Sequence, residues 1–181
     1  MRERRRKGRL RRGTTSLRNG AGLNRKFGSM LRQTTIQERL GWAVSPELYD
    51  TIRRLWIKHS KAEDHRDLEG LMETLSEDCV YEIVPTGQRW AGHAGARQFY
   101  TSFLSAFPDV EFNLTDIVIG PQGVFEVAEM TGTHHGVWAG VEPSGKIVRA
   151  TILILFPWNP EAGKFAGEKI YFDQLAFPLE K

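Results

Sequence analysis

The chain is poor in cysteine and has no long hydrophobic stretch. Cys79 is the only cysteine among its 181 residues, so no intramolecular disulfide can form. Proteins of this kind are typical of a reducing, intracellular setting, and the sequence therefore predicts a cytoplasmic protein. No apolar run approaches the roughly 20 residues that a membrane-spanning helix needs.

Several motifs that carry chemistry in other proteins are also absent. The histidines do not occur in a His-Glu-x-x-His run or at another recognised ligand spacing, so no metal site is predicted. No phosphate-binding glycine loop and no dinucleotide fingerprint is present, so no cofactor is predicted. Ser144 lacks the Gly-x-Ser-x-Gly context of a nucleophile, and Cys79 has no basic neighbour to activate its thiol. What remains is acid–base chemistry without a cofactor in an apolar cavity.

Charge is divided sharply along the chain. Residues 1–40 carry 13 Lys and Arg against two Glu, whereas residues 41–181 carry 12 basic and 20 acidic side chains. The sequence predicts a disordered basic tail over residues 1–44 and one folded domain over residues 45–181. The acidic domain repels phosphate backbones, so we expect it not to bind nucleic acid. The tail fits a contact with nucleic acid or an anionic membrane, a targeting segment, or an extension before a translation start at Met30, and the last is favoured.

Helical signals dominate the first half of the domain. Ser45 is a good N-cap and Pro46 suits a first helical position, so a helix is predicted from there to about residue 60. His59 lies on its apolar face. A second helix is predicted from residue 68 to before residue 78, and a strand over residues 79–84. A third helix, with an aromatic face, begins at residues 92–95 and ends at Pro108.

The second half has the patterns of strands. Four are predicted, over residues 110–119, 124–135, 146–158 and 168–177, joined by short turns rich in Gly, Pro and Asn. Strands joined this closely must be antiparallel. The order α-α-β-α-β-β-β-β predicts an α+β domain with its helices on one face of a curved antiparallel sheet.

Asp173 is the first candidate functional residue. It lies in Lys169-Ile170-Tyr171-Phe172-Asp173-Gln174-Leu175, an apolar and aromatic run in which a buried carboxylate needs a partner or keeps its proton. Burial raises the pKa of such a group toward the range useful for proton transfer. The alternative is an Asp on the wet face of an edge strand, paired to a Lys such as Lys169. Both faces of this strand are largely apolar, so alternation does not decide between them.

A second set of candidates lies on the strand that ends at His135. His134, Met130 and Glu126 share one face, and His135 points to the other. Taken alone, His134 is more simply a hydrogen-bonded structural residue, and Glu126 a solvated charge near a turn. Five aromatic residues are plausible walls of a cavity, although an aromatic stripe on a helix is more often plain core: Trp90, Phe99, Phe103, Trp138 and Tyr171.

Four segments together resemble the SnoaL-like polyketide cyclase family, also called ester cyclases. They are Gly132-Thr133-His134-His135-Gly136, Gly140-Val141-Glu142-Pro143-Ser144-Gly145-Lys146, Glu168-Lys169-Ile170-Tyr171-Phe172-Asp173-Gln174 and Ala106-Phe107-Pro108-Asp109. The resemblance runs from about Ser45 to Phe177. It implies a cone-shaped fold like that of nuclear transport factor 2, in which a curved sheet wraps around helices and encloses a deep apolar pocket.

The resemblance also implies a reaction. In the family, an Asp of the last strand is the acid or base of an aldol ring closure assisted by a His, and these positions match Asp173 and His134. A cyclase, isomerase or lyase acting on a small hydrophobic carbonyl compound is therefore expected, with Tyr171 or His134 stabilising an enolate. Limonene-type epoxide hydrolases share the Tyr-Phe-Asp segment, but their Arg-x-Asp pair is replaced here by Glu126-Val127-Ala128. A third possibility is a non-catalytic binding module, and because this fold often pairs through its sheet, a homodimer is expected.

Overall fold

The computed structural model describes residues 34–173, which fall into two units divided between Leu40 and Gly41. In the first unit, helix α1 (Ile36–Leu40) is capped by Thr35, whose Oγ1 accepts a hydrogen bond from the backbone N–H of Glu38 at 3.2 Å. This short helix lies within the predicted tail, most of which is outside the described residues. The second unit holds all other elements.

Helix α2 (Pro46–Asp64) begins where the sequence predicts. The hydroxyl of Ser45 accepts a hydrogen bond from the N–H of Leu48 at 3.2 Å, and Pro46 occupies the first helical position. The helix buries Ile52, His59 and Ala62 and continues about four residues beyond its predicted end. That extra turn includes Glu63 and directs it toward the core side of the sheet.

Two further helices and a hairpin complete the first half. Helix α3 (Leu68–Thr74) is capped by Asp67 and leads directly into strand β1 (Leu75–Ile83). Strand β2 (Gln88–Ala91) pairs antiparallel with β1, and helix α4 (Gly92–Ala106) follows. The sequence analysis missed β2 and began β1 four residues late, because the Ser-Glu-Asp segment that opens β1 is polar.

The second half consists of four long strands. They are β3 (Glu111–Gly120), β4 (Gly123–Thr133), β5 (Ile147–Asn159) and β6 (Lys164–Phe172). Consecutive pairs among them are antiparallel, as predicted. The six strands of the described region form one sheet in the order β2-β1-β6-β5-β4-β3. Strands β1 and β6 run parallel, so the sheet is mixed rather than purely antiparallel.

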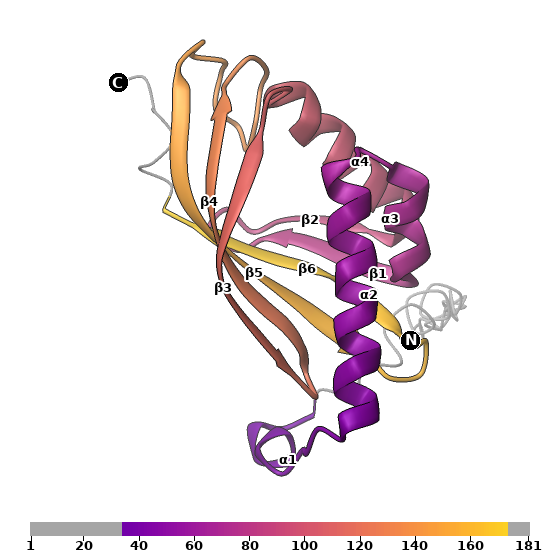
Figure 1. The fold of residues 1–181 in the computed structure, drawn as a ribbon. Helices are drawn as coiled ribbons and strands as arrows, with labels where there is room; N and C mark the ends of the chain where they lie inside the picture. The colour runs from indigo at the N-terminus through magenta and orange to yellow at the C-terminus, as the bar shows by residue number, and fades with distance from the viewer. Residues whose placement is uncertain (1–33, 174–181) are drawn as a thin grey trace, which may run out of the picture. The chain divides into compact units, whose positions relative to one another are not determined.

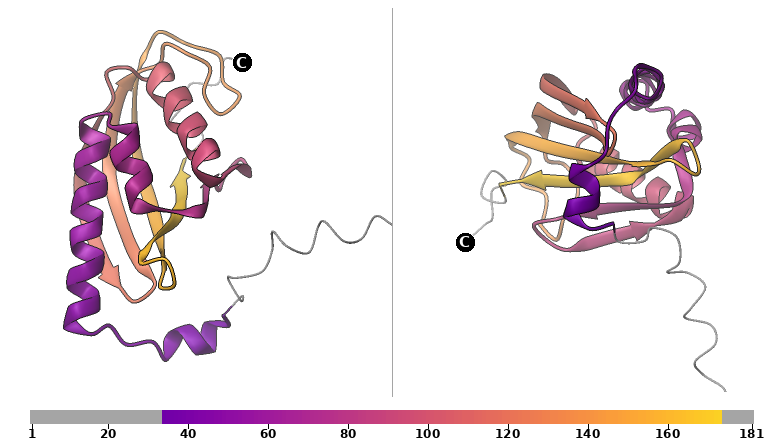
Figure 2. Two further views of the ribbon diagram at one scale, coloured as in Figure 1. Left: turned by 90° about the vertical axis from the view of Figure 1, so that its right-hand side faces the viewer. Right: turned by 90° about the horizontal axis from the view of Figure 1, so that it is seen from below.

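Helices α2, α3 and α4 lie on one side of the curved sheet (Figures 1 and 2). The core forms between these layers and is rich in aromatic side chains from α4 and aliphatic ones from β5. The α+β class and the arrangement of helices against a curved sheet are therefore as predicted. No helix of the described part is long and apolar enough to span a membrane.

A glycine of β6, Gly167, allows close contact with β1 next to Glu168. Gly167 has a φ of 110°, and a Cβ at this position would lie 2.0 Å from the carbonyl oxygen of Val80. Only glycine permits this approach. Val80 and Gly167 are partners in the parallel ladder, and the next pair is Tyr81 and Glu168, whose side chains therefore lie side by side.

Candidate functional site

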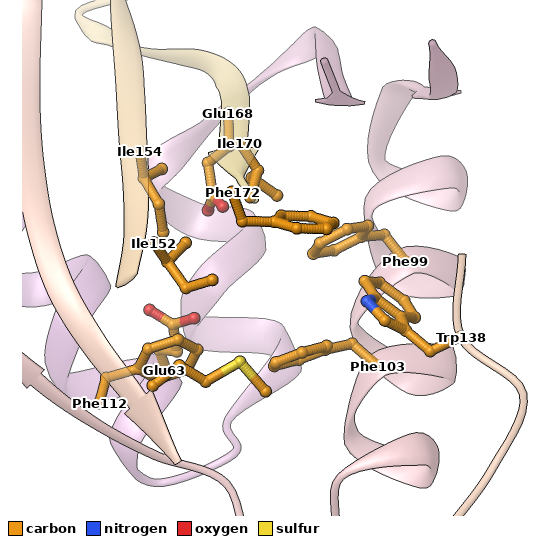
Figure 3. A pocket seen from close by; sticks show the side chains of 11 residues that line it. Glu63, Phe99, Phe103, Phe112, Trp138, Ile152, Ile154, Glu168, Ile170 and Phe172 are labelled. Carbon is orange, nitrogen blue, oxygen red and sulfur yellow. The ribbon is translucent and has the colours of Figure 1, made fainter. Parts of the chain in front are cut away.

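A cavity lies between helix α4, the last residues of α2 and the concave face of the sheet (Figure 3). Its walls are apolar, except that Glu63 and Glu168 direct their carboxyl groups into it from two sides. The lining residues are Glu63, Phe99, Phe103, Phe112, Met130, Trp138, Ile152, Ile154, Glu168, Ile170 and Phe172. An apolar enclosure with a few convergent polar groups is the usual form of a small-molecule site.

The cavity has two larger neighbours. The space between its atoms, counted to the open mouth, is about 410 Å³. Glu63 and Phe112 also line both adjoining cavities, of about 1140 Å³ and 670 Å³. These two side chains are therefore common to all three cavities.

Glu168 is held by a network of buried hydrogen bonds. The residue is 2% exposed, and its Oε1 accepts hydrogen bonds from the hydroxyl of Tyr100 at 2.7 Å and that of Tyr81 at 2.8 Å. The Nε2 atom of His59 lies 3.1 Å from the same oxygen. Burial, followed by the charge of Glu168, raises the pKa values of both tyrosines well above the ordinary value, so both remain donors.

The residues of this network come from five different elements, one of which is β6 with Glu168 itself. Tyr81 reaches Glu168 because they are neighbours in the β1–β6 ladder, Tyr100 comes from α4, and His59 comes from the buried face of α2. Thr74, the last residue of α3, places its Oγ1 2.7 Å from Nδ1 of His59. The carboxylate is thus fixed by residues far apart in sequence, as expected of a pre-organised polar group.

Glu63 is the second carboxyl group of the cavity, and it is held differently. The residue is half-buried, and its carboxyl group makes no hydrogen bond within residues 34–173, whereas its backbone carbonyl accepts one from the N–H of Arg66 at 2.9 Å. Burial raises the pKa of Glu63 well above its ordinary value, and the negative charges of Glu168, Glu126 and Asp64 act in the same direction. Arg66 opposes this only in part. These effects favour the protonated form of Glu63, which can donate a hydrogen bond or a proton.

Glu126 forms a third acidic position in the adjoining 670 Å³ cavity. It is buried, and its Oε2 accepts a hydrogen bond from Nε1 of Trp56 at 2.8 Å. Burial and the charge of Glu168 raise the pKa of Glu126 to about 7, although the bond from Trp56 lowers it. Glu126 is therefore not the solvated charge that one interpretation of the sequence suggested, because its strand face turns toward the helices.

The structure brings three of the five predicted aromatic wall residues together with the candidate Met130. Phe99, Phe103, Trp138 and Met130 all line the cavity, and the ring of Trp138 lies 5.0 Å from that of Phe103 and 5.4 Å from that of Phe99. Trp90 is half-buried behind this layer, with its ring 5.3 Å from Phe99, and does not line the cavity.

Asp173 and Tyr171 lie elsewhere, contrary to the expectation of a buried carboxylate. Both are exposed, and neither lines the cavity. The reason is strand alternation: Glu168, Ile170 and Phe172 point into the cavity, so the intervening side chains of β6 point away.

His134 is buried but does not reach the cavity. Its ring stacks on Phe107 with centroids 5.1 Å apart and planes at 16°, and neither ring nitrogen has a hydrogen-bond partner within the described residues. Burial lowers the pKa of His134, which disfavours its charged form. The structure therefore places His134 and Asp173 apart from the two carboxyl groups of the cavity.

Sequence reasoning missed Glu168, Glu63 and the role of His59. A signal for Glu168 was present, since it shares strand parity with the apolar Ile170 and Phe172. Glu63 was missed because helix α2 was ended too early. His59 was recognised on the apolar face of its helix, but no local pattern reveals partners that lie 15, 41 and 109 residues away.

Metal ligands are not grouped in the described part of the chain. No set of three or more His, Cys, Asp or Glu residues among residues 34–173 is arranged to hold a metal ion. Burial raises the pKa of the Cys79 thiol to about 12, so this side chain is neither a thiolate ligand nor an activated nucleophile at neutral pH.

Solved structures share this fold across most of their length. A Jannaschia sp. CCS1 protein, described as a SnoaL-like polyketide cyclase by inference, has a TM-score of 0.64 at 22% identity, covering 75% of this chain and 94% of its own. IdmH of Streptomyces antibioticus, assigned as a polyketide cyclase, gives 0.55 at 21% identity, with 69% and 94% covered. AclR of Streptomyces galilaeus, assigned as a hydroxylase, gives 0.55 at 22% identity, with 69% and 90% covered.

Sequence comparison assigns the family. A search of curated proteins found no match. The sequence profile of the SnoaL-like polyketide cyclases, however, matches residues 48–178, which is most of the chain and nearly all of its second unit. The chain belongs to the SnoaL-like polyketide cyclase family.

Proposed function

We propose that the domain is a cofactor-free acid–base enzyme, a cyclase or isomerase, that acts on a small hydrophobic carbonyl compound. One observation carries this proposal: two carboxyl groups face the same aromatic cavity, and their surroundings differ. Glu168 is fixed by hydrogen-bond donors, whereas the carboxyl group of Glu63 has a raised pKa and no hydrogen bond in the described region. Pairs of titratable groups in contrasting environments divide the roles of base and acid. Membership of a cyclase family supports the same reaction class.

The chemistry assigns one step to each carboxyl group. Glu168 removes a proton from the carbon next to the substrate carbonyl, and the electron pair of that C–H bond moves toward the carbonyl oxygen. Glu63 donates its proton to that oxygen, which yields a neutral enol and leaves Glu63 ionised. In a cyclisation the enol carbon then attacks a second carbonyl carbon; the enol O–H returns its proton to Glu63, and the second carbonyl oxygen takes the proton held by Glu168 and becomes a hydroxyl. In an isomerisation the enol takes the proton of Glu168 at another carbon, and its O–H returns a proton to Glu63. The apolar walls exclude water, which strengthens these interactions.

Asp173 remains the competing base, because the family resemblance implies it. Its exposure and its absence from the cavity lining favour Glu168 instead. The two assignments can be distinguished by substitution. If Glu168 is the base, neutralising Glu168 stops proton removal; if Asp173 is the base, neutralising Asp173 does.

The test measures that proton removal without requiring the natural substrate. Aryl β-diketones that raise the melting temperature of the protein are incubated with it in D₂O, and deuterium uptake at the acidic carbon is followed by NMR. We expect Glu168→Gln to slow uptake by about 100-fold or more, because a positioned base contributes that much. The matched control Asp173→Asn is expected to leave the rate within about twofold. The reverse result would return the role to Asp173, and equal rates in both variants and in buffer would refute the enzyme proposal.

The two other functions give different results in the same samples. An epoxide hydrolase would convert a limonene-type epoxide to a diol containing oxygen-18 from labelled water, which we do not expect because Glu126-Val127-Ala128 replaces the Arg-x-Asp pair. A binding module would be stabilised by the diketones but would exchange no deuterium. Either outcome would replace the present proposal.

A further inference from the structure

A threonine determines which nitrogen of His59 carries a proton. The Oγ1 atom of Thr74 donates its only hydrogen to the carbonyl oxygen of Leu71, at 2.6 Å. It can therefore only accept in its contact with Nδ1 of His59, at 2.7 Å. Nδ1 of His59 must carry a hydrogen, and a neutral His59 would then have a bare lone pair at Nε2.

That lone pair would face oxygens that are themselves acceptors. Nε2 of His59 lies 3.1 Å from Oε1 of Glu168 and 3.2 Å from the hydroxyl oxygen of Tyr100. The hydroxyls of Tyr100 and Tyr81 have their shortest contacts with Oε1, at 2.7 and 2.8 Å, whereas the two hydroxyl oxygens lie 3.2 Å from each other. With both hydrogens directed to the nearer acceptor, Oε1, neither is available to Nε2, and one further proton lies between His59 and Glu168.

We infer that this proton lies on His59, and that His59 is a positioning residue that keeps Glu168 ionised and aimed at the cavity. Three donors then converge on Oε1, which suits an ionised carboxylate, an acceptor only, better than a protonated carboxyl group that must also donate. The inference rests on the proposed function, because it concerns the base of that reaction. His59 itself does not line the cavity shared by Glu63 and Glu168.

The arrangement leaves the second oxygen of Glu168 for the substrate. Oε2 makes no hydrogen bond within residues 34–173, while Oε1 is occupied by all three donors. When Oε2 takes a proton from a substrate carbon, the positive charge of His59 and the two tyrosine hydrogen bonds stay in place. The carboxyl group is then poised to return that proton, and no proton leaves the network.

The hydrogen count on His59 is measurable without any substrate. In ¹⁵N-labelled wild-type protein at pH 7, we expect two protonated ring nitrogens for His59 in long-range ¹H–¹⁵N spectra. His134 is an internal reference, since burial lowers its pKa and it should show one unprotonated nitrogen. An unprotonated Nε2 on His59 in the wild-type spectrum would overturn the inference.

Substitution of the threonine separates positioning from folding. Thr74→Val removes the acceptor for Nδ1–H at nearly the same volume, and Thr74→Ser retains it. We expect Thr74→Val to lose the two-proton signature of His59 and to slow deuterium exchange by roughly 10- to 100-fold, with Thr74→Ser close to wild type. A Thr74→Val protein that keeps both the signature and the rate would refute the role of His59. If the signature is present but Glu168→Gln has no effect on exchange, the proposed function has failed and the hydrogen assignment stands.

Discussion

Two histidines of this domain are fully buried, yet their surroundings are opposite. His59 lies between α2 and β6 with polar atoms of Thr74, Tyr100 and Glu168 within 3.2 Å of its ring nitrogens. His134 lies beyond the end of β4 against the ring of Phe107, with no hydrogen-bond partner in the described part of the chain. Burial makes an unpaired polar group costly and a paired one strongly directional. The partners of a buried histidine, rather than its burial, therefore indicate what it does.

The contrast also separates a sequence motif from a site. His134 was singled out because it occupies a recognisable position between two glycines, whereas His59 occupies one of several positions on an amphipathic helix. The structure connects the second, and not the first, to a cavity-facing carboxylate.

The largest effect is expected when His59 is removed. His59→Leu leaves Glu168 buried without its positive partner, which should lower the free energy of unfolding by about 3–5 kcal/mol. Urea denaturation at pH 7 measures this change. Combining His59→Leu with Glu168→Gln should recover part of the loss, because no charge is then left unpaired. If His59→Leu cost no more than His134→Leu, the contrast between the two regions would be wrong.

A smaller effect is expected at Glu126, which lines the same adjoining cavity as His59. Its pKa is about 7 in the folded protein against an ordinary value of 4.5, so between these values the folded state binds more protons than the unfolded state. Stability should therefore fall as pH rises from about 4.5 to about 7, by about 3 kcal/mol for this group. Glu126→Gln keeps an acceptor for Trp56 and removes this loss.

The measurement for Glu126 is a difference between two pH values. Urea denaturation of wild type and Glu126→Gln should show the variant gaining up to about 3 kcal/mol relative to wild type between pH 5 and pH 8. Glu63 changes in the same direction in both proteins, so only the difference reports on Glu126. A difference that is constant with pH would mean that Glu126 titrates normally and is open to water.

Most helices and strands of the fold could be predicted from local sequence patterns. Ser45 and Pro46 determine the start of α2, and turn residues separate β3, β4, β5 and β6 closely enough to require antiparallel pairing. The parallel pairing of β1 and β6 was not accessible, because it joins segments about 87 residues apart and depends on a backbone contact of Gly167. Local patterns carry no information about such a contact.

The candidate site could be predicted only in part from the sequence, because most of its contacts join segments that are far apart along the chain. Phe99 and Phe103 follow from helical periodicity, and Met130 from strand alternation. The sequence does not indicate which face of β6 meets the helices, because both faces are largely apolar. The choice between Asp173 and Glu168 as the buried carboxylate depends on that face. A carboxylate whose partners come from α2, α4 and β1 can be recognised only once those elements are assembled.

The smallest effect is expected at His134. Because burial lowers its pKa, the folded state binds fewer protons than the unfolded state just below the ordinary value of 6.5. His134 therefore reduces stability as pH falls below about 6.5, and His134→Leu should abolish that decrease. At pH 7 the variant loses a ring stack but also removes two unpaired nitrogens, so a net gain of about 1 kcal/mol is expected. Thermal unfolding at pH 5 and pH 7 measures both, and a loss of several kcal/mol at pH 7 would show that His134 has a polar partner and resembles His59 after all.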